Sequence, residues 1–103
     1  MVIGVCCLTL ALPGNDSLKG KRSVIRRVLD RTRNKFNVAA AEVDELDSHR
    51  RAVLGFSVVS NDTGHAQSML DKLVGFIDSM GLAVLVGRTS ELIHVGREHG
   101  GLS

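Results

Sequence analysis

A run of basic side chains between residues 19 and 35 is the part of this sequence best suited to chemistry. These 17 residues hold eight Lys or Arg residues and one acid, Asp30, although the whole chain has a formal net charge of only +2. Outside the run, five Lys or Arg residues stand against ten Asp or Glu residues. Because Arg binds phosphate bidentately and stacks on bases, this composition favours a polyanionic partner such as RNA.

The spacing of these cations places most of them on one flank of a helix. At 100° per residue, Lys19, Arg22, Arg26 and Arg33 fall roughly 60° to 120° from Ile25, beside an apolar stripe. The flank runs roughly 21 Å along the helix axis, comparable with a few successive phosphates. The predicted RNA-phosphate contacts are Lys19, Lys21, Arg22, Arg26 and Arg33. An alternative stays open, in which these cations are solvated or paired with the protein's own carboxylates.

Cysteine and histidine offer little further chemistry. Cys6 and Cys7 are adjacent, so a strand would point them to opposite faces and a bond between them would be strained. We expect both thiols to be small apolar fillers in a reducing compartment. The four histidines lack the spacing of a zinc site, so we predict no metal, no cofactor and no catalytic residue (His49, His65, His94, His99).

Hydrophobic periodicity predicts the helices and strands that position the basic flank. Residues 2–12, 37–47, 51–60 and 82–95 have extended character, whereas residues 18–36 and 63–80 repeat apolar side chains at helical spacing. Ser17 and the 61–63 segment are predicted N-caps, and Gly81 is predicted to end the second helix. The order β-α-β-β-α-β is that of the ferredoxin-like fold, an α+β arrangement with a four-stranded antiparallel sheet and both helices on one face.

This fold leaves one face of the sheet without a helix. We expect a single domain over residues 1–96 and a flexible tail over residues 97–103. In the first strand, the set of alternate residues from Gly4 to Leu12 should meet the helices. The other set is also apolar, which makes it a candidate dimer face (Ile3, Val5, Cys7, Thr9).

The sheet itself is poorly equipped to bind RNA bases. The chain has no Trp, no Tyr and only three Phe, so stacking platforms cannot be assembled. We expect Phe56, in the third strand, to lie in the core. RNA contact should therefore be made through phosphates and shape, with strong salt dependence and weak sequence preference.

Several segments resemble the YlxP-like family of small bacterial proteins. The similarity is carried by MVIGVCCLTLALPGNDSLKGKR, by RNKFNV followed by AEVDELD, by RAVLGFSVVSND and by the amphipathic second helix, which together cover residues 1 to about 80. The resemblance implies a ferredoxin-like fold and, because such genes usually lie among those for translation, a connection with RNA or the ribosome. It implies no catalytic residues. Gly20 departs from the family, which often has an acid at this position of a capping box.

An enzyme of the acylphosphatase type is the activity that this fold invites. Such a hydrolase needs an arginine in the loop after the first strand, but Pro13-Gly14-Asn15-Asp16 has none and carries a carboxylate instead. A non-enzymatic RNA- or ribosome-associated protein is therefore the main hypothesis. A homodimeric interaction module that uses the open sheet face and binds no nucleic acid is the alternative.

We expect the protein to act in the cytoplasm. The first twelve residues are apolar, but no basic segment precedes them and no small-residue cleavage site follows, so they do not resemble a signal peptide. No apolar run approaches the ~20 residues that a membrane-spanning helix requires.

Overall fold

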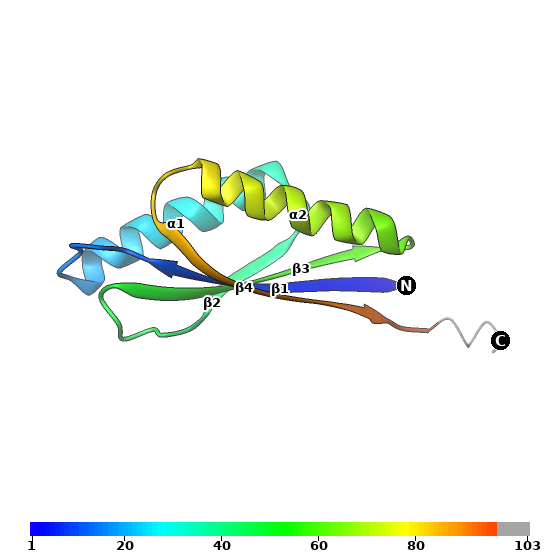
Figure 1. The fold of residues 1–103 in the computed structure, drawn as a ribbon, viewed down its shortest axis with the longest axis horizontal. Helices are drawn as coiled ribbons and strands as arrows, with labels where there is room; N and C mark the ends of the chain where they lie inside the picture. The colour runs from blue at the N-terminus through cyan, green and yellow to red at the C-terminus, as the bar shows by residue number, and fades with distance from the viewer. Residues whose placement is uncertain (97–103) are drawn as a thin grey trace.

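Four strands and two helices make up residues 1–96, the part of the chain that the computed structural model describes. The elements are β1 (Val2–Ala11), α1 (Leu18–Lys35), β2 (Ala39–Asp44), β3 (Arg51–Ser60), α2 (Thr63–Ser79) and β4 (Val84–His94). Figure 1 shows both helices on the same side of the sheet. The predicted ferredoxin-like order is confirmed. The predicted tail, residues 97–103, lies outside the described residues.

The sheet is antiparallel, with strand order β2-β3-β1-β4. β1 is therefore a central strand, and β2 and β4 are the edges. Ten unbroken pairs join β1 to β3, whereas the pairing of β1 with β4 shifts register between Thr9 and Leu10. A second shift lies between Glu42 and Asp44 in β2, so Val86 and Val43 are the extra residues of two bulges.

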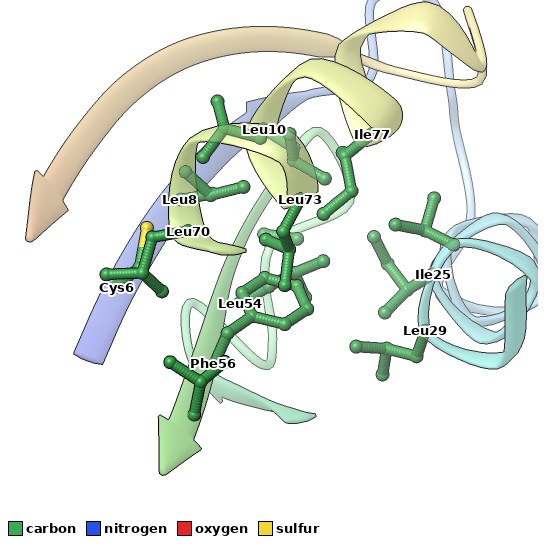
Figure 2. Packing of buried hydrophobic residues seen from close by; sticks show 14 of the residues in the cluster. Cys6, Leu8, Leu10, Ile25, Leu29, Leu54, Phe56, Leu70, Leu73 and Ile77 are labelled. Carbon is green, nitrogen blue, oxygen red and sulfur yellow. The ribbon is translucent and has the colours of Figure 1, made fainter. Parts of the chain in front are cut away.

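The core lies between the sheet and the two helices. Cys6, Leu8 and Leu10 point from β1 toward α2, where Leu70 and Leu73 meet them (Figure 2). Alternation along a strand sends successive side chains to opposite faces, which explains why Val2, Gly4 and the even-numbered residues that follow are buried. Phe56 is only 3% exposed, as predicted.

Both helices begin at the caps that the sequence indicates. The Ser17 hydroxyl accepts a hydrogen bond from the Gly20 amide at 3.0 Å, and the Asp62 carboxylate accepts one from the His65 amide at 2.8 Å. After α2, Gly81 has φ +67°, a left-handed conformation that glycine adopts without steric cost.

Two sequence predictions need correction. Cys7 is exposed on the open face of the sheet, because residues of odd number in β1 point away from the helices, so it is not a buried filler. The sequence predicts a second strand over residues 37–47, but β2 spans only Ala39–Asp44. Glu45 adopts φ +58° directly afterwards and ends the extended segment.

Candidate nucleic-acid interface

The predicted cations of α1 lie along the flank of the helix that faces β2. Arg33 fixes this placement, because its Nη2 donates a hydrogen bond to the Ala40 carbonyl of β2 at 2.6 Å. Since β2 is an edge strand, the flank opens to the side of the molecule. We call Lys19, Arg22, Arg26 and Arg33 the basic lane. All four side chains are exposed.

Two hollows follow the basic lane. One, of about 380 Å³, lies between α1 and β2, and its lining includes Arg22, Arg26, Arg33 and Glu42 with the apolar Ile25 and Leu29. The other, of about 360 Å³, is lined by Lys19, Arg22, Ser23 and Arg26. Arg22 and Arg26 line both hollows, which therefore adjoin, and Asp30 and Glu42 are the acids in the lining of the first.

Most cations of the segment have no acidic partner among residues 1–96. Arg33 Nη1 lies 3.4 Å from Asp30 Oδ1, an exposed pair one helical turn apart that contributes little. Lys35 Nζ lies 5.6 Å from the centroid of the Phe76 ring. Within the described residues, no carboxylate lies within 4.0 Å of six of the eight cations (Lys19, Arg22, Arg26, Arg27, Arg31, Lys35). Pairing inside the described part of the protein therefore leaves the lane available.

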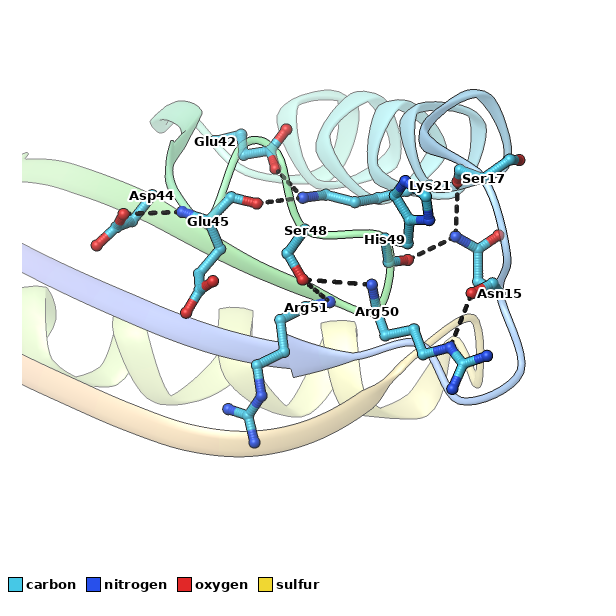
Figure 3. A network of polar contacts seen from close by, with 10 residues as sticks. All are labelled: Asn15, Ser17, Lys21, Glu42, Asp44, Glu45, Ser48, His49, Arg50 and Arg51. Atoms are coloured by element: carbon cyan, nitrogen blue, oxygen red, sulfur yellow. Dashed lines mark hydrogen bonds and ion pairs between the residues drawn. The ribbon is translucent and has the colours of Figure 1, made fainter.

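Lys21 does not belong to this surface, so its prediction as a phosphate contact is corrected. Its side chain is 1% exposed, and Nζ lies 2.9 Å from Glu42 Oε2. The same ammonium donates a hydrogen bond to the Glu45 carbonyl at 2.6 Å (Figure 3). Removing an ammonium from water is costly unless it is paired in this way. Lys21 therefore joins α1 to β2 and cannot reach a ligand.

A signal in the sequence could have separated Lys21 from its neighbours. On the helical wheel Lys21 lies about 40° from Ile25, on the side opposite the basic lane. That direction is inside the apolar stripe, between Ile25 and Val28, and a lone cation there requires an acidic partner. Sequence reasoning did not identify Glu42 as that partner, because the pair joins residues on two different elements.

The loop before α1 is tied to the β2–β3 connection. The Asn15 amide nitrogen donates to the carbonyl of Ser17 at 2.8 Å and to that of His49 at 2.6 Å, while Arg50 Nε donates to the Asn15 carbonyl at 3.0 Å (Figure 3). A Cβ at residue 20 would lie 2.5 Å from Asn15 Oδ1, so Gly20 is required by this arrangement. The missing acid of the capping box is thus explained by Asn15.

The residues predicted as a dimer face lie on the side of the sheet that faces away from both helices. Ile3, Val5 and Thr9 are partly exposed there and Cys7 is exposed, well apart from the basic lane. Residues 1–96 contain no group of three His, Cys, Asp or Glu side chains placed to hold a metal ion. Neither described helix is long and apolar enough to cross a membrane.

Comparison with known proteins agrees with this fold and with the sequence resemblance. Residues 3–89 match the model of a family described as protein of unknown function DUF503. This chain belongs to the DUF503 family. It is also 40% identical over 63 residues to the uncharacterised protein YlxP of Bacillus subtilis (strain 168), an alignment that covers 61% of this chain and 68% of YlxP. The predicted membership of a YlxP-like family is confirmed.

Solved structures show the same fold. A de novo designed protein with a ferredoxin fold superposes with a TM-score of 0.55 at 18% identity, covering 93% of this chain and 88% of the design. A putative chlorite dismutase superposes with a TM-score of 0.53 at 10% identity, and the match covers all of this chain but 48% of that protein. At such low identities, these similarities concern the fold alone.

Proposed function

We propose that this DUF503 protein is a non-enzymatic RNA-binding protein of the cytoplasm that holds the phosphates of an RNA strand along its basic lane. The observation that carries the proposal is the pair Arg22 and Arg26. Both are exposed, both line the two adjoining hollows, and no carboxylate of residues 1–96 lies within 4.0 Å of either.

The spacing and chemistry of the lane suit a phosphate backbone. Lys19 and Arg33 lie roughly 21 Å apart along the helix axis. A strand that neutralises four cations over this length releases condensed counterions, which supplies affinity without base recognition. The YlxP-like resemblance, with its implied link to translation, favours RNA, including ribosomal RNA, over other polyanions.

Two competing functions predict different surfaces. A pure interaction module predicts that the cations pair internally, yet the described residues pair only Lys21 and Arg33 with carboxylates in this segment. An acylphosphatase-like hydrolase needs a cation in the loop after β1, where Asn15 instead makes hydrogen bonds to backbone carbonyls. These observations support binding over catalysis.

A salt titration tests the proposal. Fluorescence anisotropy with a labelled single-stranded RNA should give a log Kd that rises with log salt concentration, with a slope of about 2 to 3 for three to four phosphate contacts. Crosslinking in live cells would then identify the RNA that is bound. Absence of measurable binding at low salt to any single-stranded or ribosomal RNA would overturn the proposal.

A further inference from the structure

The face of the sheet that no helix covers, called the open face, exposes apolar side chains on other strands as well as on β1, the strand from which the sequence predicted a dimer face. Residues from all four strands contribute, and in the described part of the chain no helix covers this side (Figure 1). Its larger exposed side chains are Val43, Val59, Val84 and Ile93, with exposed fractions of 51%, 64%, 51% and 38%. An apolar area that reaches across a whole sheet marks an interaction site.

The open face is not flat. A hollow of about 380 Å³ lies over β2, β3 and β1, where the side chains are small; its lining on the open face includes Ala39, Ala41, Gly55, Ser57 and Cys7. The bulkier Val84 and Ile93 lie on β4, at the far edge of the sheet. The same face therefore has a depression over the middle of its strands and larger apolar side chains near the two ends of β4.

The area available matches that of a stable dimer. Strands of 10, 6, 10 and 11 residues, at about 3.4 Å per residue and about 4.8 Å apart, give a four-stranded face of roughly 600 Å² in projection. Side-chain relief makes the accessible area larger, and standard interfaces bury about 800 Å² on each partner. Packing of one sheet on another at about 10 Å separation is a common arrangement in proteins.

The distribution of charge favours a second copy as the occupant. Within β1–β4, the charged residues whose register places them on the open face, Arg51, Asp44 and Glu91, lie toward its edges. Two copies therefore meet without burying a cluster of like charge. The basic lane lies on the helix side, so a polyanion has few cations to contact on this face.

We propose that two copies of this chain pack through the open faces of their sheets. A two-fold axis that runs along the strands between β3 and β1 would lay β4 of each copy over β2 of the other, because the strand order is β2-β3-β1-β4. Large exposed side chains of both copies, Val59, Val84 and Ile93, are then removed from water.

This dimer carries its RNA-binding surfaces on opposite outer sides. With layers about 10 Å apart, the two α1 helices are separated by roughly 30 Å. This distance exceeds the Debye length of about 8 Å at physiological salt, so the two lanes do not repel each other appreciably. Dimerisation and RNA binding are therefore independent, and an experiment can contradict either proposal without contradicting the other.

The mass in solution tests the proposal. Sedimentation velocity should give twice the 11.1 kDa of one chain for the wild type. Ala41→Glu places a carboxylate in the hollow and should yield a monomer with unchanged RNA affinity, whereas Asn34→Glu, which adds the same charge on the exposed side of α1, should remain a dimer. Circular dichroism checks that both variants fold. A wild-type monomer at all concentrations up to 0.1 mM, on the order of weak-dimer Kd values, overturns the proposal.

Cys7 gives a second readout that needs no variant. Its exposed thiol lies on the open face, whereas the adjacent Cys6 is 2% exposed in the core and serves as the internal control. Alkylation of Cys7 should slow severalfold as the protein concentration rises through the dimer Kd. A dimer whose Cys7 reacts at the same rate at all concentrations would form through another surface, and this inference would be wrong.

Discussion

Lys21 and Arg22 are neighbours in α1, yet the fold gives them opposite roles. The Lys21 ammonium is 1% exposed and held by Glu42 and the Glu45 carbonyl, whereas Arg22 is exposed and lines both basic hollows. Their directions on the helix decide the difference, because one points into the apolar stripe and the other points to its flank. A cation count therefore cannot distinguish a structural link from a binding surface.

The energetics of the two regions differ as well. Breaking a buried ion pair by removing one partner typically costs 3–5 kcal/mol, since a charge remains without compensation. Exposed cations that make no ion pair contribute to stability within about ±0.5 kcal/mol. Substitutions around Lys21 should therefore alter folding, and substitutions in the basic lane should alter binding.

Glu42→Gln should have the largest effect on stability. It leaves the Lys21 ammonium with the Glu45 carbonyl but without an anion, so we expect a loss of about 3 kcal/mol in the free energy of unfolding, measured by urea denaturation. Asp47→Asn, at an exposed acid in the connection between β2 and β3, is the control and should change stability by less than about 0.5 kcal/mol. Equal effects would mean that the buried pair is unimportant.

Lys21→Met should cost less, about 1 to 2 kcal/mol, because the Glu42 side chain that remains is 16% exposed, against 1% for Lys21. Arg22→Met is the matched substitution one residue along. It should leave stability nearly unchanged and lower the salt slope of RNA binding by about 0.7, whereas Lys21→Met should leave that slope intact. A reduced salt slope in Lys21→Met would mean that Lys21 contacts RNA as Arg22 does, which would contradict its structural role.

Gly20→Ala should destabilise the protein by less than about 1 kcal/mol, although alanine ordinarily stabilises a helix by about that amount relative to glycine. The added methyl group would displace the Asn15 side chain from its two hydrogen bonds. In an Asn15→Ala background the same substitution should become stabilising. Thermal denaturation of the four proteins in this cycle checks the change of sign.

The smallest effect concerns the ion pair between α2 and β4. The hydrogen bond from Arg88 lowers the pKa of Asp71 below its ordinary value of 3.8, with a further contribution from Gln67. The pair therefore stabilises the fold above that pH, and the contribution is lost as the pH falls through the lowered pKa. Asp71→Asn should be slightly less stable than the wild type at pH 7, and urea denaturation should show this difference disappearing as the pH falls through the lowered pKa of Asp71.

Sequence periodicity was sufficient to predict the fold because each element carries its own pattern. Alternation in β1 and the helical repeats of α1 and α2 identify the core faces without knowledge of partners. The Lys21–Glu42 pair and the bond from Asn15 to His49 join residues 21 and 34 positions apart, and no local pattern indicates them. Strand alternation predicts Cys7 on the open face, whereas the usual burial of free cysteine predicts a filler, and the alternation is correct.

The most direct test compares two double variants of α1 in the same RNA salt titration. Arg22→Gln with Arg26→Gln removes two cations from the basic lane, and Arg27→Gln with Arg31→Gln removes two from the other flank of the helix. We predict that the first lowers the salt slope by about 1.4 and weakens binding about tenfold or more at low salt, while the second changes neither appreciably. Identical affinity and slope in the first variant and the wild type would contradict the account.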